Sequence, residues 1–242
     1  LIKGYKENGY QAIKIYHTIS KPVHEAIVKA GLKYNIPIVG HVSFEGKIEG
    51  ALNSHQNSIE HLRGYDIDGL SMETLAKDGG RSAERFGSWL NMTDERMREL
   101  VLKTKEAGTW NIPTFIVVEL LYDLQKRKRI VNHPDLRLIP PGNRAAILSN
   151  GLDEIFSPAS KEALRKSMPK MYQMIKSMND MGVGVMTGTD TMVPYLIPGF
   201  TPIDEIEHFV DAGLSPYDAI KASTSGPAEF LGKQGSFGTI SV

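Results

Sequence analysis

The sequence contains no cysteine among its 242 residues. Disulfide bonds and thiolate metal sites are therefore excluded, and any metal ion would have to be held by histidine, carboxylate or modified lysine. These ligand types favour hard or borderline ions such as zinc.

The chain also lacks net charge and long apolar runs. Its 28 Lys and Arg residues balance its 28 Asp and Glu residues, which disfavours binding to nucleic acid or to an anionic membrane. No apolar run reaches the roughly 18 residues that a membrane-spanning helix needs, and no secretory signal begins at Leu1. The cell compartment stays undetermined.

Short apolar stretches between helical patterns predict parallel β-strands. They cover residues 11–16, 36–42, 57–62, 109–118 and 183–189. A whole (β/α)₈ barrel of about 250 residues would fit the length of the chain, but so few strands do not close one. The expected fold is α/β, a TIM-type barrel that is incomplete in this chain. Its edge strands would need strands from another chain, or the isolated chain should behave poorly. A homo-oligomer is also considered.

Capping residues and apolar periodicity predict helices between the strands. Two cover residues 22–34 and 94–107, and two more open at the Thr-Pro and Ser-Pro pairs that begin at Thr201 and Ser215.

Two stretches do not fit the alternation of strands and helices. Residues 121–170 are expected to form an insertion, either a lid or specificity element or a pair of solvated surface helices. Residues 79–91 are expected to be a second loop on the same face.

Chemically useful side chains lie near the ends of four predicted strands. They are Lys14, His41, His61 and, after the stretch Val183-Gly184-Val185, Asp190. Catalytic groups of α/β barrels lie at the carboxyl ends of the strands, so we expect these four to converge. Each has an alternative when taken singly: a hydrogen-bonded core histidine, an ion pair of Lys14 with Glu60, or a turn cap by Asp190 before Pro194.

Taken in order, these motifs resemble the amidohydrolase superfamily, in particular its branch of imidazolonepropionase and metal-dependent dipeptidases. The resemblance rests on Ile13-Lys14-Ile15, Gly40-His41-Val42, Ser58-Ile59-Glu60-His61-Leu62, Gly188-Thr189-Asp190-Thr191 and the stretch from Ala212 to Gly232. It covers most of the chain.

The resemblance implies a metal-dependent hydrolase of carbon–nitrogen bonds that acts on a small amide or dipeptide. One or two zinc-like ions would be held by His41, His61, Asp190 and a carboxylated Lys14, with Asp190 also serving as the general base that works with metal-activated water.

Substrate contacts are expected near the same strand ends, from Tyr16, His17, Arg63 and Tyr65. An arginine can hold a substrate carboxylate through two parallel hydrogen bonds.

The sequence departs from the family pattern in one respect: the family's first strand carries a His-x-His pair. None of the seven histidines here is two residues from another; they are His17, His24, His41, His55, His61, His133 and His208. We therefore expect residues 1–235 to be the fourth to eighth strands of the barrel with their helices, inactive alone, and residues 236–242 to lead towards a missing β-sandwich. The alternatives are a lactonase or phosphotriesterase on the same centre, or a non-catalytic fragment.

The remaining histidines carry no metal pattern. His24 is expected on the surface of its helix, and His55, His133 and His208 are expected to be ordinary polar residues.

Overall fold

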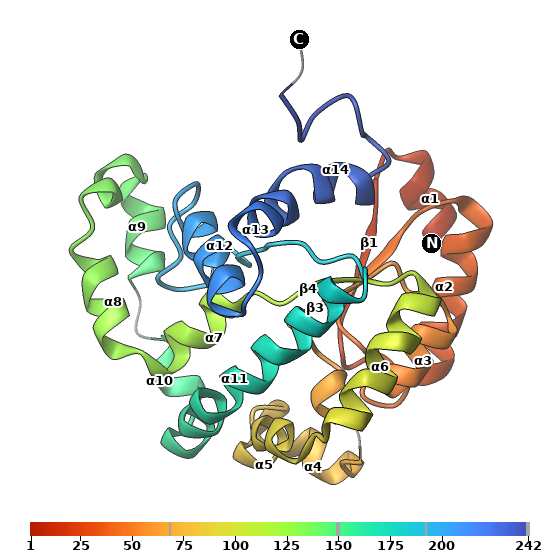
Figure 1. The fold of residues 1–242 in the computed structure, drawn as a ribbon, viewed down its shortest axis with the longest axis horizontal. Helices are drawn as coiled ribbons and strands as arrows, with labels where there is room; N and C mark the ends of the chain where they lie inside the picture. The colour runs from red at the N-terminus through yellow and green to blue at the C-terminus, as the bar shows by residue number, and fades with distance from the viewer. Residues whose placement is uncertain (68, 149–150, 192, 241–242) are drawn as a thin grey trace.

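The computed structural model describes residues 1–67, 69–148, 151–191 and 193–240. Short parallel strands lie among many helices in an α/β fold (Figure 1). The strands are β1 (Ile13–Ile15), β2 (Ile38–Gly40), β3 (Ser58–Glu60) and β4 (Trp110–Ile112).

The strands pair in parallel, β1 with β2 and β3 with β4. Asn57 joins the two pairs: its backbone N–H donates to the Ile38 carbonyl at 2.9 Å, and its side-chain oxygen accepts from the Ile38 N–H at 2.9 Å. The carboxyl ends of the strands therefore meet at one edge. Within the described residues the strands do not close into a barrel.

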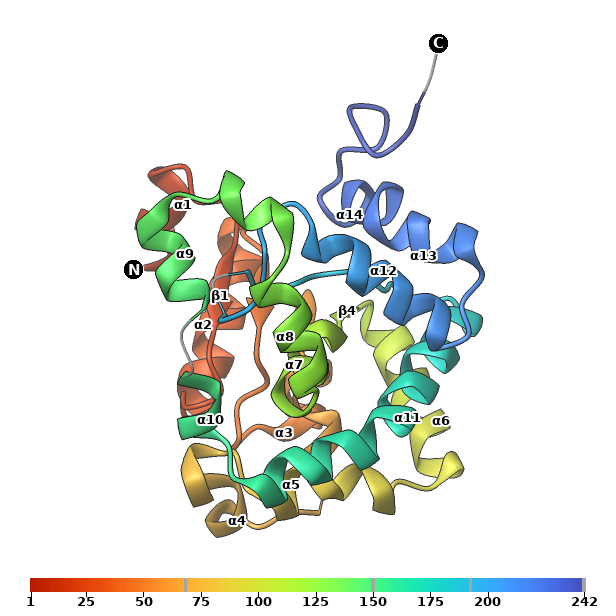
Figure 2. The ribbon, with the colours of Figure 1, turned by 90° about the vertical axis from the view of Figure 1, so that its left-hand side faces the viewer.

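Helices surround this strand layer. Figures 1 and 2 show α11 as a long helix running across the molecule, and it contacts α5, α6 and α7. The helices are α1 (Ile2–Glu7), α2 (Lys21–Tyr34), α3 (Lys47–Asn53), α4 (Met72–Ala76), α5 (Ala83–Gly87), α6 (Asp94–Ala107), α7 (Phe115–Tyr122), α8 (Leu124–Val131), α9 (Pro141–Ile147), α10 (Gly151–Ile155), α11 (Pro158–Asp180), α12 (Thr201–Asp211), α13 (Pro216–Ser223) and α14 (Ser225–Phe230), with 3₁₀ turns η1 (Tyr65–Ile67), η2 (Lys77–Gly79), η3 (Ser88–Asn91) and η4 (Pro134–Leu138). None of the described helices is long and apolar enough to cross a membrane.

The helices predicted from capping residues are confirmed. Helix α6 has the predicted bounds because the Thr93 hydroxyl accepts the Arg96 N–H at 3.2 Å and Gly108 ends the helix with a φ of 67°. Helix α2 begins one residue before its predicted start, and α12 and α13 begin at their Thr-Pro and Ser-Pro pairs.

The main core lies between α6, α7, α11 and α12. Leu100, Phe115, Met174 and Phe209 are each fully buried in it. Burying a side chain of this size contributes about 1.5 to 3 kcal/mol, so this core stabilises the packing of these helices against one another.

The strand predicted at residues 109–118 is wrong in its second half. The strand ends at Ile112, Pro113 has no N–H to continue the ladder, and Thr114 turns into the left-handed region with a φ of 52°. Helix α7 then begins at Phe115. Its residues are apolar on nearly every side, so periodicity could not distinguish a buried strand from a buried helix.

Two further predictions need correction. The strand expected at 183–189 is reduced to a single bridge, Val185 to Asn111, because the chain leaves β4 after the Met186 N–H donates to the Asn111 carbonyl at 2.9 Å. The loop expected at 79–91 is mostly helical, since it contains α5 and η3.

The stretch predicted as an insertion, 121–170, holds α8, η4, α9, α10 and the first half of α11. Its helices α8 and α9 enclose a small apolar cluster with Leu136, Ile139 and Ile197. Of the segment 236–242, the last two residues lie outside the described residues.

A buried carboxylate fixes the start of α7. Glu205 on α12 is fully buried and accepts the backbone N–H groups of Phe115 and Ile116 at 2.9 and 2.8 Å. Burial raises the pKa of Glu205 to about 7, although these two hydrogen bonds oppose the shift.

We expect Glu205 to make stability depend on pH. The folded pKa lies above the unfolded value of 4.5, so the folded protein binds the proton more tightly and the free energy of unfolding falls as pH rises from about 4.5 to about 7. Glu205→Gln should remove this fall, on the order of 3 kcal/mol, as measured by urea unfolding at both ends of the range. Glu207→Gln, an exposed neighbour on α12, is the control and should keep the wild-type slope. A Glu205→Gln protein with that slope would show that the proton binds elsewhere.

Candidate metal centre

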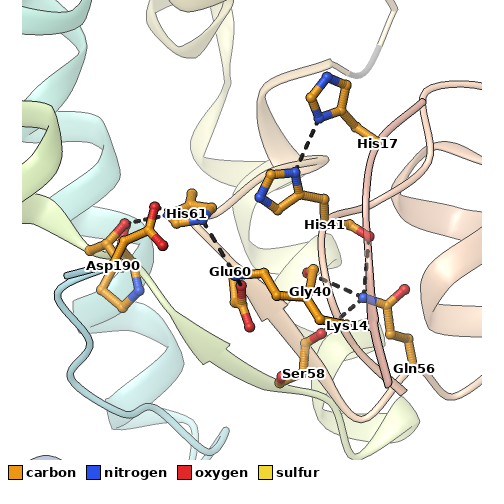
Figure 3. Close-up of polar contacts among 11 residues, drawn as sticks. Lys14, His17, Gly40, His41, Gln56, Ser58, Glu60, His61 and Asp190 are labelled. Atoms are coloured by element: carbon orange, nitrogen blue, oxygen red, sulfur yellow. Dashed lines mark hydrogen bonds and ion pairs between the residues drawn. The ribbon is translucent and has the colours of Figure 1, made fainter. Parts of the chain in front are cut away.

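The strand ends open into a cavity of about 310 Å³. Lys14, His41, His61 and Asp190 all line it, so the predicted convergence of these residues is observed (Figure 3). A larger cavity of about 380 Å³ lies at the opposite end of β4, between α6, α13 and α14. It contains no histidine among its lining residues.

His61 stands at the centre of the site. It follows β3 with a left-handed φ of 60°, and its backbone N–H donates to the Ile112 carbonyl at 2.7 Å. Its Nε2 lies 3.8 Å from the Asp190 carboxylate and 4.0 Å from the Glu60 carboxylate. The ring therefore presents one nitrogen to two carboxylates from different elements.

The other nitrogen of His61 is held by Thr114. The Thr114 hydroxyl lies 2.7 Å from the Pro113 carbonyl and 2.6 Å from His61 Nδ1. When the hydroxyl donates to the carbonyl, it accepts the Nδ1 proton, and the Nε2 lone pair is then directed at the cavity. Metal-binding histidines are commonly oriented by such a second hydrogen bond.

His41 lies beside His61, with ring centres 4.9 Å apart. Its backbone N–H donates to the Ile15 carbonyl at 3.0 Å, and its ring Nδ1 lies 3.1 Å from Nδ1 of His17. Tyr16 covers both His17 and His41, at 4.1 and 4.4 Å between ring centres. Tyr16 and His17 thus reach the cavity as predicted, but His17 is tied to His41.

Behind His41, the buried Gln56 fixes the ends of β2 and β3. Its amide nitrogen donates to the carbonyls of Gly40, His41 and Ser58 at 3.3, 3.4 and 2.9 Å. Its oxygen lies 3.1 Å from Nε2 of His24. His24 is therefore buried, and the surface position predicted for it is wrong.

The histidines of the site are neutral. Burial, then the positive charge of Arg63, lowers the pKa of His61 to about 3 and that of His41 still further, and burial lowers the pKa of His17 to about 3. A neutral imidazole has a free lone pair and can bind a metal ion.

Glu60 is the site residue that sequence reasoning named only as an alternative partner of Lys14. The Lys14 ammonium lies 2.5 Å from the Glu60 carboxylate. Ligand atoms of His41, Glu60 and His61 all lie within 4.8 Å of one another. The adjacency of Glu60 and His61 at a strand end is the signal that could have found it.

Of the predicted substrate contacts after His61, one reaches the cavity and one does not. Arg63 lines the cavity, while its buried Nε and Nη1 have no hydrogen-bond partner among the residues that the structure describes. Burial and the nearby Arg85 lower its pKa to about 9, so it stays charged at neutral pH. Tyr65 instead points into the core, where its hydroxyl lies 2.8 Å from that of Thr104.

The last histidines lie away from the cavity. His55 is exposed, with Nδ1 3.1 Å from the Ala107 carbonyl, and His133 caps η4 by accepting the Asp135 N–H. His208 was expected to be an ordinary polar residue, but it is buried. Its Nδ1 lies 2.6 Å from the Tyr172 hydroxyl, and its Nε2 lies 3.3 Å from the Glu119 carboxylate.

A family model described as the amidohydrolase family matches residues 2–242. The chain belongs to the amidohydrolase family. This confirms the resemblance seen in its motifs. No curated protein matches the chain significantly.

Three solved structures are similar to this chain in fold. A bottromycin amidohydrolase matches with 21% sequence identity and a TM-score of 0.63, over 96% of this chain and 49% of its own. A Xaa-Pro dipeptidase with methionine bound in its active site has 19% identity and a TM-score of 0.59, over 99% and 49%. The ochratoxinase of A. niger has 22% identity and a TM-score of 0.56, over 96% and 43%.

The amidohydrolase chain thus spans about half the length of the structures it matches. Such low identities establish the fold and not the substrate. The residues that are present fit a divalent cation, because two neutral imidazoles and one carboxylate offer converging ligand atoms of suitable types.

We expect Thr114 to control metal affinity. Thr114→Val keeps the shape and the branched side chain but removes the acceptor for His61 Nδ1–H, so the dissociation constant for zinc should rise about 10- to 100-fold. Thr114→Ser, which keeps the oxygen, should remain close to the parent. Calorimetric zinc titration of the three proteins checks this, and equal affinities for the valine and serine variants would contradict it.

Proposed function

We propose that the chain supplies the fourth to eighth barrel strands of a longer metal-dependent hydrolase, and that this enzyme cleaves a carbon–nitrogen bond in a dipeptide or cyclic amide. The observation that carries the proposal is the convergence of His41, Glu60, His61 and Asp190 at the carboxyl ends of parallel strands. The half-length match and the missing His-x-His pair support a site completed by residues outside this chain.

His41, His61 and Glu60 would hold one ion, and zinc suits this set of ligands. A divalent ion bound there would lower the pKa of a water molecule and polarise the substrate carbonyl. Lys14 as an ammonium repels such an ion and forms an ion pair with Glu60, which would otherwise be free to bind the ion. Carboxylation of Lys14 by carbon dioxide would remove its positive charge, release Glu60 and add an anionic ligand.

The side chains of this chain then divide the work of amide hydrolysis. Asp190, held 3.8 Å from His61, accepts a proton during the attack of water and returns it to the leaving nitrogen. Arg63 binds a substrate carboxylate through its unpaired N–H groups. Tyr16 and His17 contact the substrate at the mouth of the cavity.

The proposal has two alternatives, another hydrolase on the same centre and a non-catalytic fragment. A lactonase or phosphotriesterase would use the same ligands, and a panel of amide, lactone and phosphotriester substrates given to the longer enzyme separates these activities. A non-catalytic fragment would hydrolyse none of them even with the rest of the barrel present.

Metal content tests the proposed ligand set. Without a His-x-His pair, the chain alone should retain at most one firmly held zinc ion. His61→Ala should abolish its retention, because the His61 ring lies beside His41, Glu60 and Asp190 and is the central ligand of the set. His55→Ala, at an exposed histidine, is the matched control. The measurement is elemental analysis after gel filtration. Two firmly held ions per chain would overturn the assignment.

The proposed base is tested in the longer enzyme. Asp190→Asn keeps the shape but removes the proton acceptor, so kcat should fall about 10²- to 10⁴-fold with little change in substrate affinity. Asp211→Asn, at an exposed position at the end of α12, should have no effect. His208 is unsuitable as a control because it is buried in a polar network. Near-normal turnover by an Asp190→Asn enzyme with full metal content would rule out this mechanism.

A further inference from the structure

Thr114 does not cap the helix that follows it. Thr93, before α6, shows the ordinary arrangement: its backbone is extended, with φ −76° and ψ 159°, and its hydroxyl accepts the Arg96 N–H at 3.2 Å. Thr114 precedes α7 in the same position, but its backbone is left-handed, with φ 52° and ψ 50°, and its side chain makes no capping bond to the described residues of α7. Its hydroxyl lies 2.6 Å from His61 Nδ1 instead.

A carboxylate from another helix caps α7 in its place. Helix α12 packs against α7 (Figures 1 and 2), and Glu205 accepts the N–H groups of Phe115 and Ile116, one on each of its oxygens. The third N–H of the helix, that of Val117, donates to the Thr114 carbonyl at 3.1 Å. The first three N–H groups of α7 are therefore satisfied without the Thr114 hydroxyl.

The Ile116 N–H is the donor for which the two caps would compete. A capping threonine accepts from the second or third N–H of its helix, and Ile116 provides the second N–H of α7. To reach it in the ordinary way, Thr114 would need the extended backbone seen at Thr93. Changing φ from 52° to −76° rotates the side chain about the N–Cα bond and moves the hydroxyl from its place beside His61.

Resting on the proposed function for its effect on metal binding, we propose that Glu205 is a positioning residue of the metal centre. By capping α7 from α12, it keeps the Thr114 hydroxyl beside His61 Nδ1, so that the neutral ring carries its proton on Nδ1 and presents Nε2 to a metal ion. Glu205 is not among the described residues that line the cavity. Its effect on His61 therefore passes through Thr114.

The tautomer of His61 is the direct readout, because nitrogen NMR shifts distinguish a protonated ring nitrogen from an unprotonated one. In the metal-free parent chain, at a pH above the Glu205 pKa of about 7, Nδ1 should carry the proton. Glu205→Gln keeps the size of the side chain but has one acceptor oxygen for two N–H groups, so the Thr114 hydroxyl should turn to the other N–H.

Without the hydroxyl, the His61 proton should move towards Nε2. The Asp190 and Glu60 carboxylates lie 3.8 and 4.0 Å from Nε2 and attract a proton on that nitrogen. Glu205→Gln should therefore populate the Nε2–H tautomer. Glu205→Asp keeps the charge but is one methylene shorter, so it should shift the tautomer in the same direction and gives the reading if the glutamine variant does not fold.

Two controls separate this effect from a general loss of stability. Glu207→Gln, at an exposed position of α12, should keep the parent tautomer. Val101→Ala removes buried volume on α6, so it should destabilise the protein and still keep the parent tautomer.

Zinc affinity shows whether Glu205 acts through Thr114. Glu205→Gln should raise the zinc dissociation constant by no more than the factor of about 10 to 100 expected for Thr114→Val. In the double variant the two effects should not multiply, because the valine has already removed the hydroxyl that Glu205 positions. Calorimetric titration of the parent, the two single variants and the double variant measures this coupling.

The outcomes separate this proposal from the proposed function. An Nε2–H tautomer in the parent chain, an unchanged tautomer in the Glu205 variants, a shift in the Val101→Ala control, or zinc effects that multiply overturns the positioning role. If the tautomer shifts as expected but no zinc binds at His61, the metal-dependent function fails and the positioning of His61 by Glu205 stands.

Discussion

The parallel pairing of β3 with β4 is the constraint on which the site depends. It sets Glu60 opposite Ile112, so His61, directly after β3, and Thr114, two residues after β4, emerge at the same edge. His61 Nδ1 and the Thr114 hydroxyl lie 2.6 Å apart. The buried Glu205 then holds the first turn of α7 against the core. A histidine on one strand is thus oriented by an oxygen on its neighbour, which is held in turn by a late helix.

Backbone strain is concentrated at this edge. His61, Leu62, Thr114 and Asp190 all have left-handed φ angles, between 48° and 60°, and for residues with side chains each such conformation costs about 1 to 3 kcal/mol. Of these residues, Leu62 is fully buried in the main core. At His61, Thr114 and Asp190 the left-handed backbone turns the chain away from an extended path, and these three side chains line the cavity.

The electrostatics of the site favour neutral histidines, because positively charged side chains also line the cavity. The charge on Arg63 and burial together keep His41 and His61 unprotonated, while Lys14 is compensated by Glu60. The carboxylate that could hold a cation is therefore shared with a lysine. Binding of a metal ion and the charge state of Lys14 are linked through Glu60, because one carboxylate cannot fully neutralise both.

The sequence by itself determined the family, the order of the strands, the bounds of α6 and the gathering of Lys14, His41, His61 and Asp190 at one edge, because short local signals and the direction of parallel strands suffice for these. It could not separate strand from helix after Ile112, where every neighbour is apolar. Nor could it place Glu60 or Tyr65, or see that His24 and His208 are buried. Those positions depend on contacts between segments far apart in the chain, such as Thr114 with His61, Glu205 with Phe115 and Gln56 with His24, and only tertiary packing decides which distant groups meet.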